Sequence, residues 1–406
     1  MISHSNTLCS RLWNYPVVDL AKIKVRVCCK TPSIQLSHED IAKYGDNVFV
    51  NLDVFKDDRK LMLEGGKPQR CDSCWNLEDQ GIHSFRDGPD RWNRYFANID
   101  YEDNTESNHP NDLDIQLDNY CDLKCIYCNE EFSSQWQTEK EKYGDIKKYI
   151  PIHTDSDKFT ELFFSWFDKV KHNFGRIAFL GGEPLISPRF YELLDRVIDS
   201  YNNDFPKDLK IYIITNLNTK EKFLDRFCDT IEKYKNKIKF IINVSMESTG
   251  EQAEFIRAGL DYERFVRNFN RIAAIQGIRI INITTINLLC LSTLSKHLEF
   301  ILELEKNYNI YIDIHGNIVT WPEHLQIGLM DRALGKKYIE ECVSLLKNKN
   351  HNTYIDFLNS LENSFQFDEL KGTEKHNKFK TELDTLSTRR LCNYKEIFKN
   401  YEYIWS

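Results

Sequence analysis

The feature that most constrains the fold is a regular alternation of short apolar runs with longer amphipathic stretches after about residue 113. The runs are rich in β-branched residues and predict strands at 113–117, 176–180, 209–215, 237–246, 279–285 and 309–314. Between them, apolar residues recur at three- and four-residue spacing and predict helices at 158–171, 189–201, 220–234, 261–274 and 294–308. This alternation is typical of βαβ units with a parallel sheet, in either an open doubly wound sheet or a partial barrel.

The chain has 406 residues, which is more than one ordinary small domain uses. Residues 1–110 have weaker periodicity and hold five cysteines, so we expect a separate metal-bearing module there. A polar stretch at 101–112 is the expected linker to the barrel, which would occupy 111–320. Residues 321–406 predict a helical carboxyl-terminal extension.

Composition predicts a globular protein, because 41% of the residues are hydrophobic and 29% are charged. A formal charge of −8 gives no attraction to phosphate backbones or anionic membranes, so nothing points to nucleic acid as a partner. No stretch reaches the ~18 apolar residues of a membrane span. We therefore expect a soluble, cytoplasmic protein without a membrane partner.

Twelve cysteines need an explanation other than disulfides in a reducing compartment, and eight of them precede residue 130. Cys121, Cys125 and Cys128 have C-x3-C-x2-C spacing directly after the first predicted strand. Three thiolates on one loop can hold three corners of a cubane iron–sulfur cluster and leave the fourth iron open to a ligand. The alternatives are a zinc site, which would need a fourth ligand, and three unrelated thiols.

This spacing, with Tyr127 just before the last cysteine, resembles the defining loop of the radical S-adenosylmethionine (SAM) superfamily. The resemblance implies a partial (β/α)6 TIM-like barrel and a [4Fe-4S] cluster whose open iron binds SAM, with Tyr127 beside the adenine. It also implies that one electron, from a donor such as flavodoxin or ferredoxin, cleaves SAM to a 5′-deoxyadenosyl radical that takes hydrogen from a substrate.

The second predicted strand ends in Gly181, Gly182, Glu183 and Pro184. Two glycines let a backbone approach a ligand closely, Glu183 offers an anion for an ammonium group, and proline stiffens the turn. An ordinary strand-to-helix turn is the alternative. The run resembles the GGEP motif of the same superfamily, which implies that it holds the SAM amino group.

Weaker matches to the superfamily follow at later strand ends, where parallel barrels build their sites. Thr215 and Asn216 resemble its Thr-Asn pair, and Ser245 lies where a serine contacts the SAM ribose or carboxylate. Glu247 stands where the family usually has aspartate, which leaves its role open. Arg257 could pair with the SAM carboxylate, or be a solvated helix arginine.

The amino-terminal cysteines supply four further ligands. Cys71 and Cys74 form a C-x2-C pair, and Cys9 with Cys28, preferred over the adjacent Cys29, completes the set. Four thiolates suit a second cluster or a zinc ion. Their order resembles the twitch module, a shortened SPASM domain, here preceding the barrel, which implies an auxiliary [4Fe-4S] cluster.

The sequence therefore predicts a radical SAM enzyme. Peptide modification, as in natural-product maturation, is the first expectation for its substrate, and a small molecule such as a sugar or nucleoside is the alternative. A non-catalytic iron–sulfur or zinc protein, such as a sensor, is the rival class. No residue stands out as a catalytic acid or base.

Overall fold

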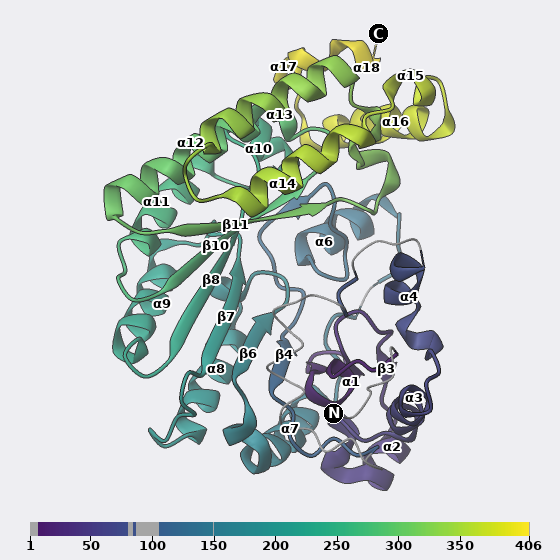
Figure 1. Cartoon of the computed structure of the whole chain (residues 1–406), viewed down its shortest axis with the longest axis vertical. Coiled ribbons are helices and arrows are strands. Elements are labelled where there is room, and N and C mark those ends of the chain that lie inside the picture. The colour runs from purple at the N-terminus through teal and green to yellow at the C-terminus, as the bar shows by residue number, and fades with distance from the viewer. Residues whose placement is uncertain (1–6, 80–83, 87–104, 149, 406) are drawn as a thin grey trace.

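The computed structural model describes residues 7–79, 84–86, 105–148 and 150–405. Within these residues the fold is mixed α/β, built on a nine-stranded sheet in the order β11-β10-β8-β7-β6-β4-β1-β2-β3 (Figure 1). Residues 101–104 of the expected linker 101–112 lie outside the described residues, and its last residue, Asp112, is the first residue of β4.

Six parallel strands form the part of the sheet that the sequence predicted. They are β4 (Asp112–Gln116), β6 (Arg176–Leu180), β7 (Lys210–Thr215), β8 (Lys239–Ser245), β10 (Arg279–Ile286) and β11 (Ile312–Ile318). Each pairs with the next along the chain. A doubly wound sheet would reverse its strand order at the middle, so the sequential order is consistent with a partial barrel. The sixth strand begins three residues later than predicted.

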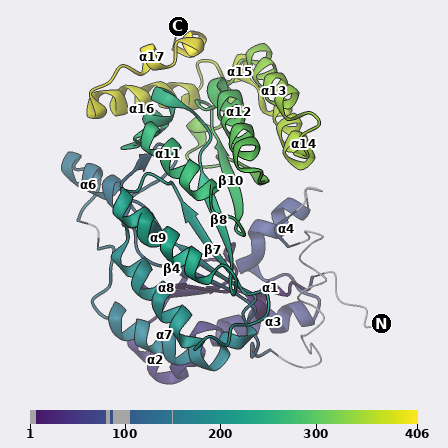
Figure 2. The same cartoon turned by 90° about the vertical axis from the view of Figure 1, so that its left-hand side faces the viewer.

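Long amphipathic helices cover one face of this sheet (Figure 2). They are α7 (Ser156–Val170), α8 (Pro188–Ser200), α9 (Glu221–Tyr234), α11 (Tyr262–Ala273) and α12 (Leu291–Tyr308). Each overlaps a predicted helix, because one apolar stripe per helix is buried against the strands.

The amino-terminal part is not detached from the sheet, contrary to the expectation of a separate module. β1 (Pro16–Asp19) pairs in parallel with β4, and β2 (Lys24–Val27) and β3 (Ile34–Gln35) continue the sheet antiparallel. These strands are at most four residues long, too short to display a clear period in sequence. The helices here are α1 (Arg11–Asn14), α2 (His38–Tyr44), α3 (Asp53–Leu63) and α4 (Asp72–Glu78). The domain division at 110 and 320 stays a prediction, as does the twitch-like character.

Two short insertions lie at the carboxyl ends of the strands. A second, two-stranded sheet joins β5 (Lys124–Cys125) to β9 (Arg257–Ala258). Next to them in the chain are α6 (Ser134–Tyr143) and α10 (Gly250–Ile256). None of these four elements was predicted from the sequence.

The carboxyl-terminal extension is helical, as predicted, and lies over the upper end of the sheet in Figure 1. It comprises α13 (Arg332–Leu346), α14 (Asn352–Ser360), α15 (Phe367–Leu370), α16 (Glu374–Arg390), α17 (Tyr394–Ile397) and α18 (Glu402–Trp405). Helix α13 packs on α12, and α14 is tied to β10 by a 2.8 Å hydrogen bond between the hydroxyls of Tyr354 and Thr284. Across the described ranges, no helix is both long and apolar enough to cross a bilayer.

Candidate iron–sulfur and SAM site

The loop after β4 carries Cys121, Cys125 and Cys128, all half-buried. Burial raises the pKa of the Cys125 thiol to about 12 and also raises the pKa values of the Cys121 and Cys128 thiols. Cys125 lies close enough to each of the other two thiols to interact with it electrostatically. The loop is fixed by Ser134, whose hydroxyl accepts from the Cys121 amide (3.2 Å) and donates to the Cys121 carbonyl (3.0 Å). The three cysteines lie on one loop, and their role as ligands of one cluster stays a prediction.

The donor chemistry of this loop fits an iron–sulfur cluster. A single zinc ion draws its sulfurs to ~2.3 Å, whereas a cubane is held by one thiolate on each of several irons. In the described part of the chain, no group of three or more His, Cys, Asp or Glu side chains is arranged to hold a metal ion. The three loop thiols are therefore not closed around a single ion, and thiolates are the ligand type that iron–sulfur clusters use.

Gly181 and Gly182 place the end of β6 directly against this loop. The Gly182 amide donates to the Asp118 carbonyl (3.0 Å), and the next amide donates to the Tyr120 carbonyl (2.8 Å). A Cβ at Gly182 would lie 2.4 Å from the Tyr120 carbonyl oxygen, and one at Gly181, where φ is +154°, would lie 2.9 Å from that of Asp118. The glycines thus admit the backbone of the cysteine loop, whereas the sequence interpretation assigned that close approach to a ligand.

Glu183 is buried among groups from two strand ends. Its carboxylate accepts from the Thr215 hydroxyl (2.6 Å), the Asn216 amide (2.6 Å) and the Leu185 amide (3.1 Å). Burial, and then the nearby charge of Asp122, raise the pKa of Glu183 to about 8. Three residues predicted separately from sequence are therefore brought into contact, and Pro184 follows at the start of a short 3₁₀ helix.

Asp122 links the cysteine loop to the end of β7, and sequence reasoning missed it. Its two carboxylate oxygens accept from the side-chain amides of Asn216 (3.1 Å) and Asn218 (2.8 Å). The partners lie more than 90 positions away in the chain, so no local pattern signals the contact.

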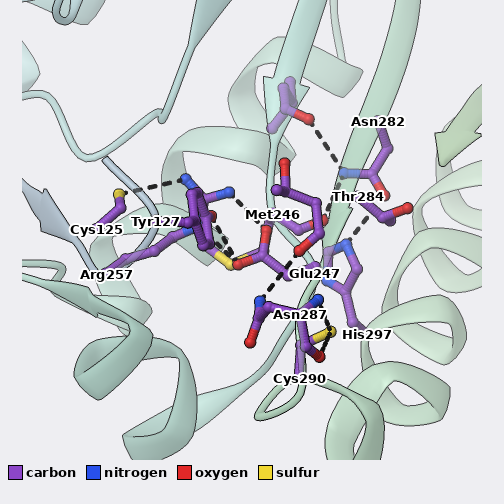
Figure 3. Close-up of polar contacts among 12 residues, drawn as sticks. Cys125, Tyr127, Met246, Glu247, Arg257, Asn282, Thr284, Asn287, Cys290 and His297 are labelled. Atoms are coloured by element: carbon purple, nitrogen blue, oxygen red, sulfur yellow. Dashed lines mark hydrogen bonds and ion pairs between the residues drawn. The ribbon is translucent and has the colours of Figure 1, made fainter. Parts of the chain in front are cut away.

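Glu247 and Arg257, both buried, form a cluster with the partly buried Tyr127 beside Cys125 (Figure 3). Glu247 accepts from Arg257 Nη2 (2.6 Å) and Nε (3.2 Å) and from the Tyr127 hydroxyl (2.9 Å). Arg257 is 3% exposed, so the solvated alternative considered from sequence is wrong. Its pairing with the SAM carboxylate stays a prediction. Ser245 ends β8, half-buried, two residues before Glu247.

The β5–β9 ribbon explains why this arginine reaches the loop. Cys125 lies directly opposite Arg257 in the antiparallel register, and the Ile126 amide donates to the Ile256 carbonyl (2.8 Å). Arg390, at the end of α16, spans the ribbon and donates to the carbonyls of Phe255 (2.8 Å) and Lys124 (3.1 Å). The carboxyl-terminal extension thus braces the cysteine loop.

A second buried pair supports the end of β8 (Figure 3). The side-chain amide of Asn282 donates to the carbonyls of Val244 (3.1 Å) and Met246 (3.2 Å), and its oxygen lies 3.0 Å from His297 Nε2. Complete burial lowers the pKa of His297 to about 3, so the ring is neutral near pH 7. These residues fix the strand end that presents Glu247.

The predicted amino-terminal ligands also meet. Cys9, Cys28, Cys71 and Cys74 line one small cavity, and Arg11 and Arg86 lie along its wall. Cys28 adopts φ of +97°, and the adjacent Cys29 is not among the residues lining the cavity. Burial raises the pKa of Cys9 to about 11 and also raises that of Cys71, whereas the pKa of Cys28 is raised first by a hydrogen bond with Cys29 and then by burial.

A larger cavity of about 730 Å³ opens beside the cysteine loop. Its wall includes Ile126 and Cys128 from the loop, and Trp321 and His324 from the segment after β11. Helix α16 completes the wall with charged side chains of both signs. Segments following the first and last strands of the predicted barrel therefore meet at one hollow.

The comparisons with known proteins concern the same region. The model of the Radical SAM superfamily matches residues 115–304. No curated protein matches the sequence.

Solved structures with similarity include "Native anSMEcpe with bound AdoMet", at 18% identity and a TM-score of 0.36, over 62% of this chain and 63% of that one. A second is Streptococcus suis SuiB bound to S-adenosylmethionine, at 14% identity and a TM-score of 0.33, over 82% and 67%. The chain thus spans less than two thirds of the anSMEcpe chain. The superfamily match covers the cysteine loop, the glycine turn and the Glu247–Arg257 pair, so this part of the chain is similar to radical SAM superfamily domains.

Proposed function

We propose that this protein is a radical SAM enzyme of the partial (β/α)6 barrel type. Cys121, Cys125 and Cys128 would hold a [4Fe-4S] cluster that binds SAM. Bound there, the cluster and SAM supply a one-electron cleavage that yields methionine and a 5′-deoxyadenosyl radical able to take hydrogen from a substrate. The main observation in support of the proposal is that the three-cysteine loop packs directly against Gly181 and Gly182. These glycines immediately precede the buried Glu183 carboxylate.

Glu183 is the residue we assign to the SAM amino group. A carboxyl group whose pKa is raised by burial is charged near pH 7 only if a cation accompanies it, and an ammonium group would be that cation. Thr215 and Asn216 hold the carboxylate in place by two 2.6 Å hydrogen bonds. Tyr127 and Ser245 remain our candidates for contacts with the adenine and with the ribose or carboxylate.

We assign an auxiliary [4Fe-4S] cluster, in a twitch-like module, to Cys9, Cys28, Cys71 and Cys74. The support is that all four buried thiols line one cavity. Two arginines beside it would offset the charge of deprotonated thiols. Four thiolates also suit zinc, and iron content separates the two assignments.

The hollow beside Cys128 is our candidate for the substrate site. Its volume of about 730 Å³ lies within the range of small-molecule sites, ~300–1,000 Å³. Charged side chains of both signs suit a polar substrate, such as a peptide segment carrying both charges, with a sugar or nucleoside as the alternative. A small protein such as flavodoxin or ferredoxin would supply the electron.

Anaerobic reconstitution with iron and sulfide, followed by dithionite and SAM, tests the proposal. We expect release of 5′-deoxyadenosine and methionine, and about eight irons per chain if both sites hold cubanes. Replacing Cys121, Cys125 and Cys128 together by alanine should leave about four irons and abolish cleavage. Cys228→Ala, on α9 away from the loop, is the control. Intact SAM in an iron-replete wild-type sample would favour the rival class, a non-catalytic iron–sulfur protein.

A further inference from the structure

We propose that Arg257 is a positioning residue that sets the reduction potential of the cluster through its contact with the Cys125 sulfur. Glu247 holds the Arg257 guanidinium in place and partly neutralises its charge. This inference rests on the proposed function, because it requires a cluster bound to Cys125. It concerns the ease of the first electron transfer, in which one electron enters and no covalent bond is made or broken.

Backbone register fixes the contact between the arginine and the sulfur. Cys125 and Arg257 are directly opposed in the β5–β9 ribbon, and Nη1 of the guanidinium lies 3.9 Å from Cys125 Sγ. Directly opposed residues of an antiparallel pair have neighbouring Cβ atoms. The contact therefore follows from the pairing of the two strands and does not depend on a mobile surface side chain (Figure 3).

Glu247 fixes the orientation of the guanidinium. It binds the edge formed by Nε and Nη2, which leaves Nη1 for the sulfur. The Tyr127 hydroxyl donates to the same carboxylate, and its ring lies 5.6 Å from Arg257 Cζ. Glu247 is fully buried, so both charges act in a medium where electrostatic effects exceed those in water.

The sign of the effect follows from the charges. Reduction adds one negative charge to a cluster, and hydrogen bonds and positive charge at its sulfurs favour the reduced form and raise the potential. Arg257 should therefore make the cluster easier to reduce. Glu247 opposes this, more weakly, because it contacts the far edge of the guanidinium while Nη1 contacts the sulfur.

The two side chains should thus shift the potential in opposite directions. Glu247→Gln keeps hydrogen-bond acceptance by the side-chain oxygen but removes the counter-charge, so the midpoint potential should rise. The double variant Glu247→Gln/Arg257→Gln removes both charges, and its midpoint should fall below that of Glu247→Gln. We expect at least a tenfold change in the reduction equilibrium constant between these two variants, about 59 mV for one electron. Arg257→Lys, which retains the charge, should lie closer to wild type than the double variant does.

The measurement is an EPR-monitored dithionite titration of reconstituted protein without SAM. The double variant replaces a buried ion pair by neutral side chains, a change that folded proteins often tolerate. Circular dichroism and iron content check that each protein is folded and loaded. Arg279→Gln is the matched control, because it removes an arginine paired with Asp313 (2.6 Å) at the opposite ends of the strands, and its midpoint should equal that of wild type.

Each outcome decides one of the two claims. Equal midpoints in wild type and all variants, with SAM cleavage intact in wild type, would overturn the inference and leave the proposed function standing. A midpoint that shifts in one direction from wild type to Glu247→Gln, and further in the same direction from Glu247→Gln to the double variant, would indicate general disruption of the loop. That result would also overturn the inference. A wild-type protein that holds no reducible cluster would contradict the proposed function itself.

Discussion

Gly182 has no room for a side chain, because the backbone of the cysteine loop occupies the space where a Cβ would be. In Gly182→Ala the new carbon would lie 2.4 Å from the Tyr120 carbonyl, so strand and loop must separate. We expect a loss of ~1–3 kcal/mol in the free energy of unfolding, measured by urea titration, and reduced iron at the loop.

Gly328→Ala is the matched control for this change. Gly328 is buried and Gly182 is partly buried, but the nearest atom to a Cβ at Gly328 is the end of the Leu370 side chain at 3.1 Å, which can move. A larger loss of stability in Gly328→Ala than in Gly182→Ala would contradict the steric account.

His297 makes a pH-dependent contribution whose sign is fixed by burial. Its pKa falls from 6.5 to about 3 on folding, so its contribution to stability is complete above pH 6.5 and is lost as the pH falls toward the folded value. The free energy of unfolding should therefore decrease on acidification, with a slope from this group of up to ~1.4 kcal/mol per pH unit. His297→Gln should flatten the dependence of the urea midpoint between about pH 7 and about pH 5, and equal slopes would refute this assignment.

At the scale of single residues, sequence was informative where a motif is local. The glycine turn, Glu183 and the three loop cysteines were all predicted, since their chemistry depends on spacing within a few positions. The Arg257–Cys125 contact joins residues 132 apart and was not foreseen, because only the pairing of two short strands creates it. Thr215 and Asn216 were each predicted from the sequence, but the hydrogen bonds that both make to Glu183 were not.

At the scale of elements, the ribbon of β5 and β9 depends on a residue of the carboxyl-terminal extension. Arg390 donates to carbonyls on both sides of the ribbon, and hydrogen bonds from charged groups contribute ~1.5–3 kcal/mol where buried. Arg390→Ala should therefore increase amide hydrogen exchange in peptides spanning 121–128 and 254–260, as measured by mass spectrometry.

Arg389→Ala serves as the comparison for the ribbon experiment. Arg389 occupies the adjacent position in α16 but pairs with the exposed Asp145 (2.6 Å). Exchange in the ribbon should be unchanged in this variant. Equal acceleration in both variants would mean that α16 as a whole, and not Arg390, braces the loop.

Long elements were predictable and short ones were not. Helices such as α8 and strands such as β6 carry enough residues to display a 3.6- or 2-residue period. β5 and β9 have two residues each, and α10 has only seven, so their existence depends on tertiary contacts. The candidate site is built largely from those contacts, so the sequence could single out candidate ligands but not the elements that support them.

At the scale of the whole molecule, both ends of the chain are integrated with the predicted barrel. The amino-terminal strands extend its sheet past β4, and the carboxyl-terminal helices form part of the wall of the hollow beside Cys128. Composition and periodicity could suggest three parts but not how they combine, because β1–β4 pairing joins segments about 100 residues apart.

The central claim is that three thiolates hold a cluster whose remaining iron is open to SAM. Its most direct measurement is the EPR spectrum of the dithionite-reduced cluster, recorded with and without SAM in a variant that lacks Cys9, Cys28, Cys71 and Cys74, so that the loop signal is isolated. We predict that SAM changes this spectrum, and that the change is absent when Cys121, Cys125 and Cys128 are replaced by alanine. An iron-loaded loop whose spectrum is the same with and without SAM would contradict the account.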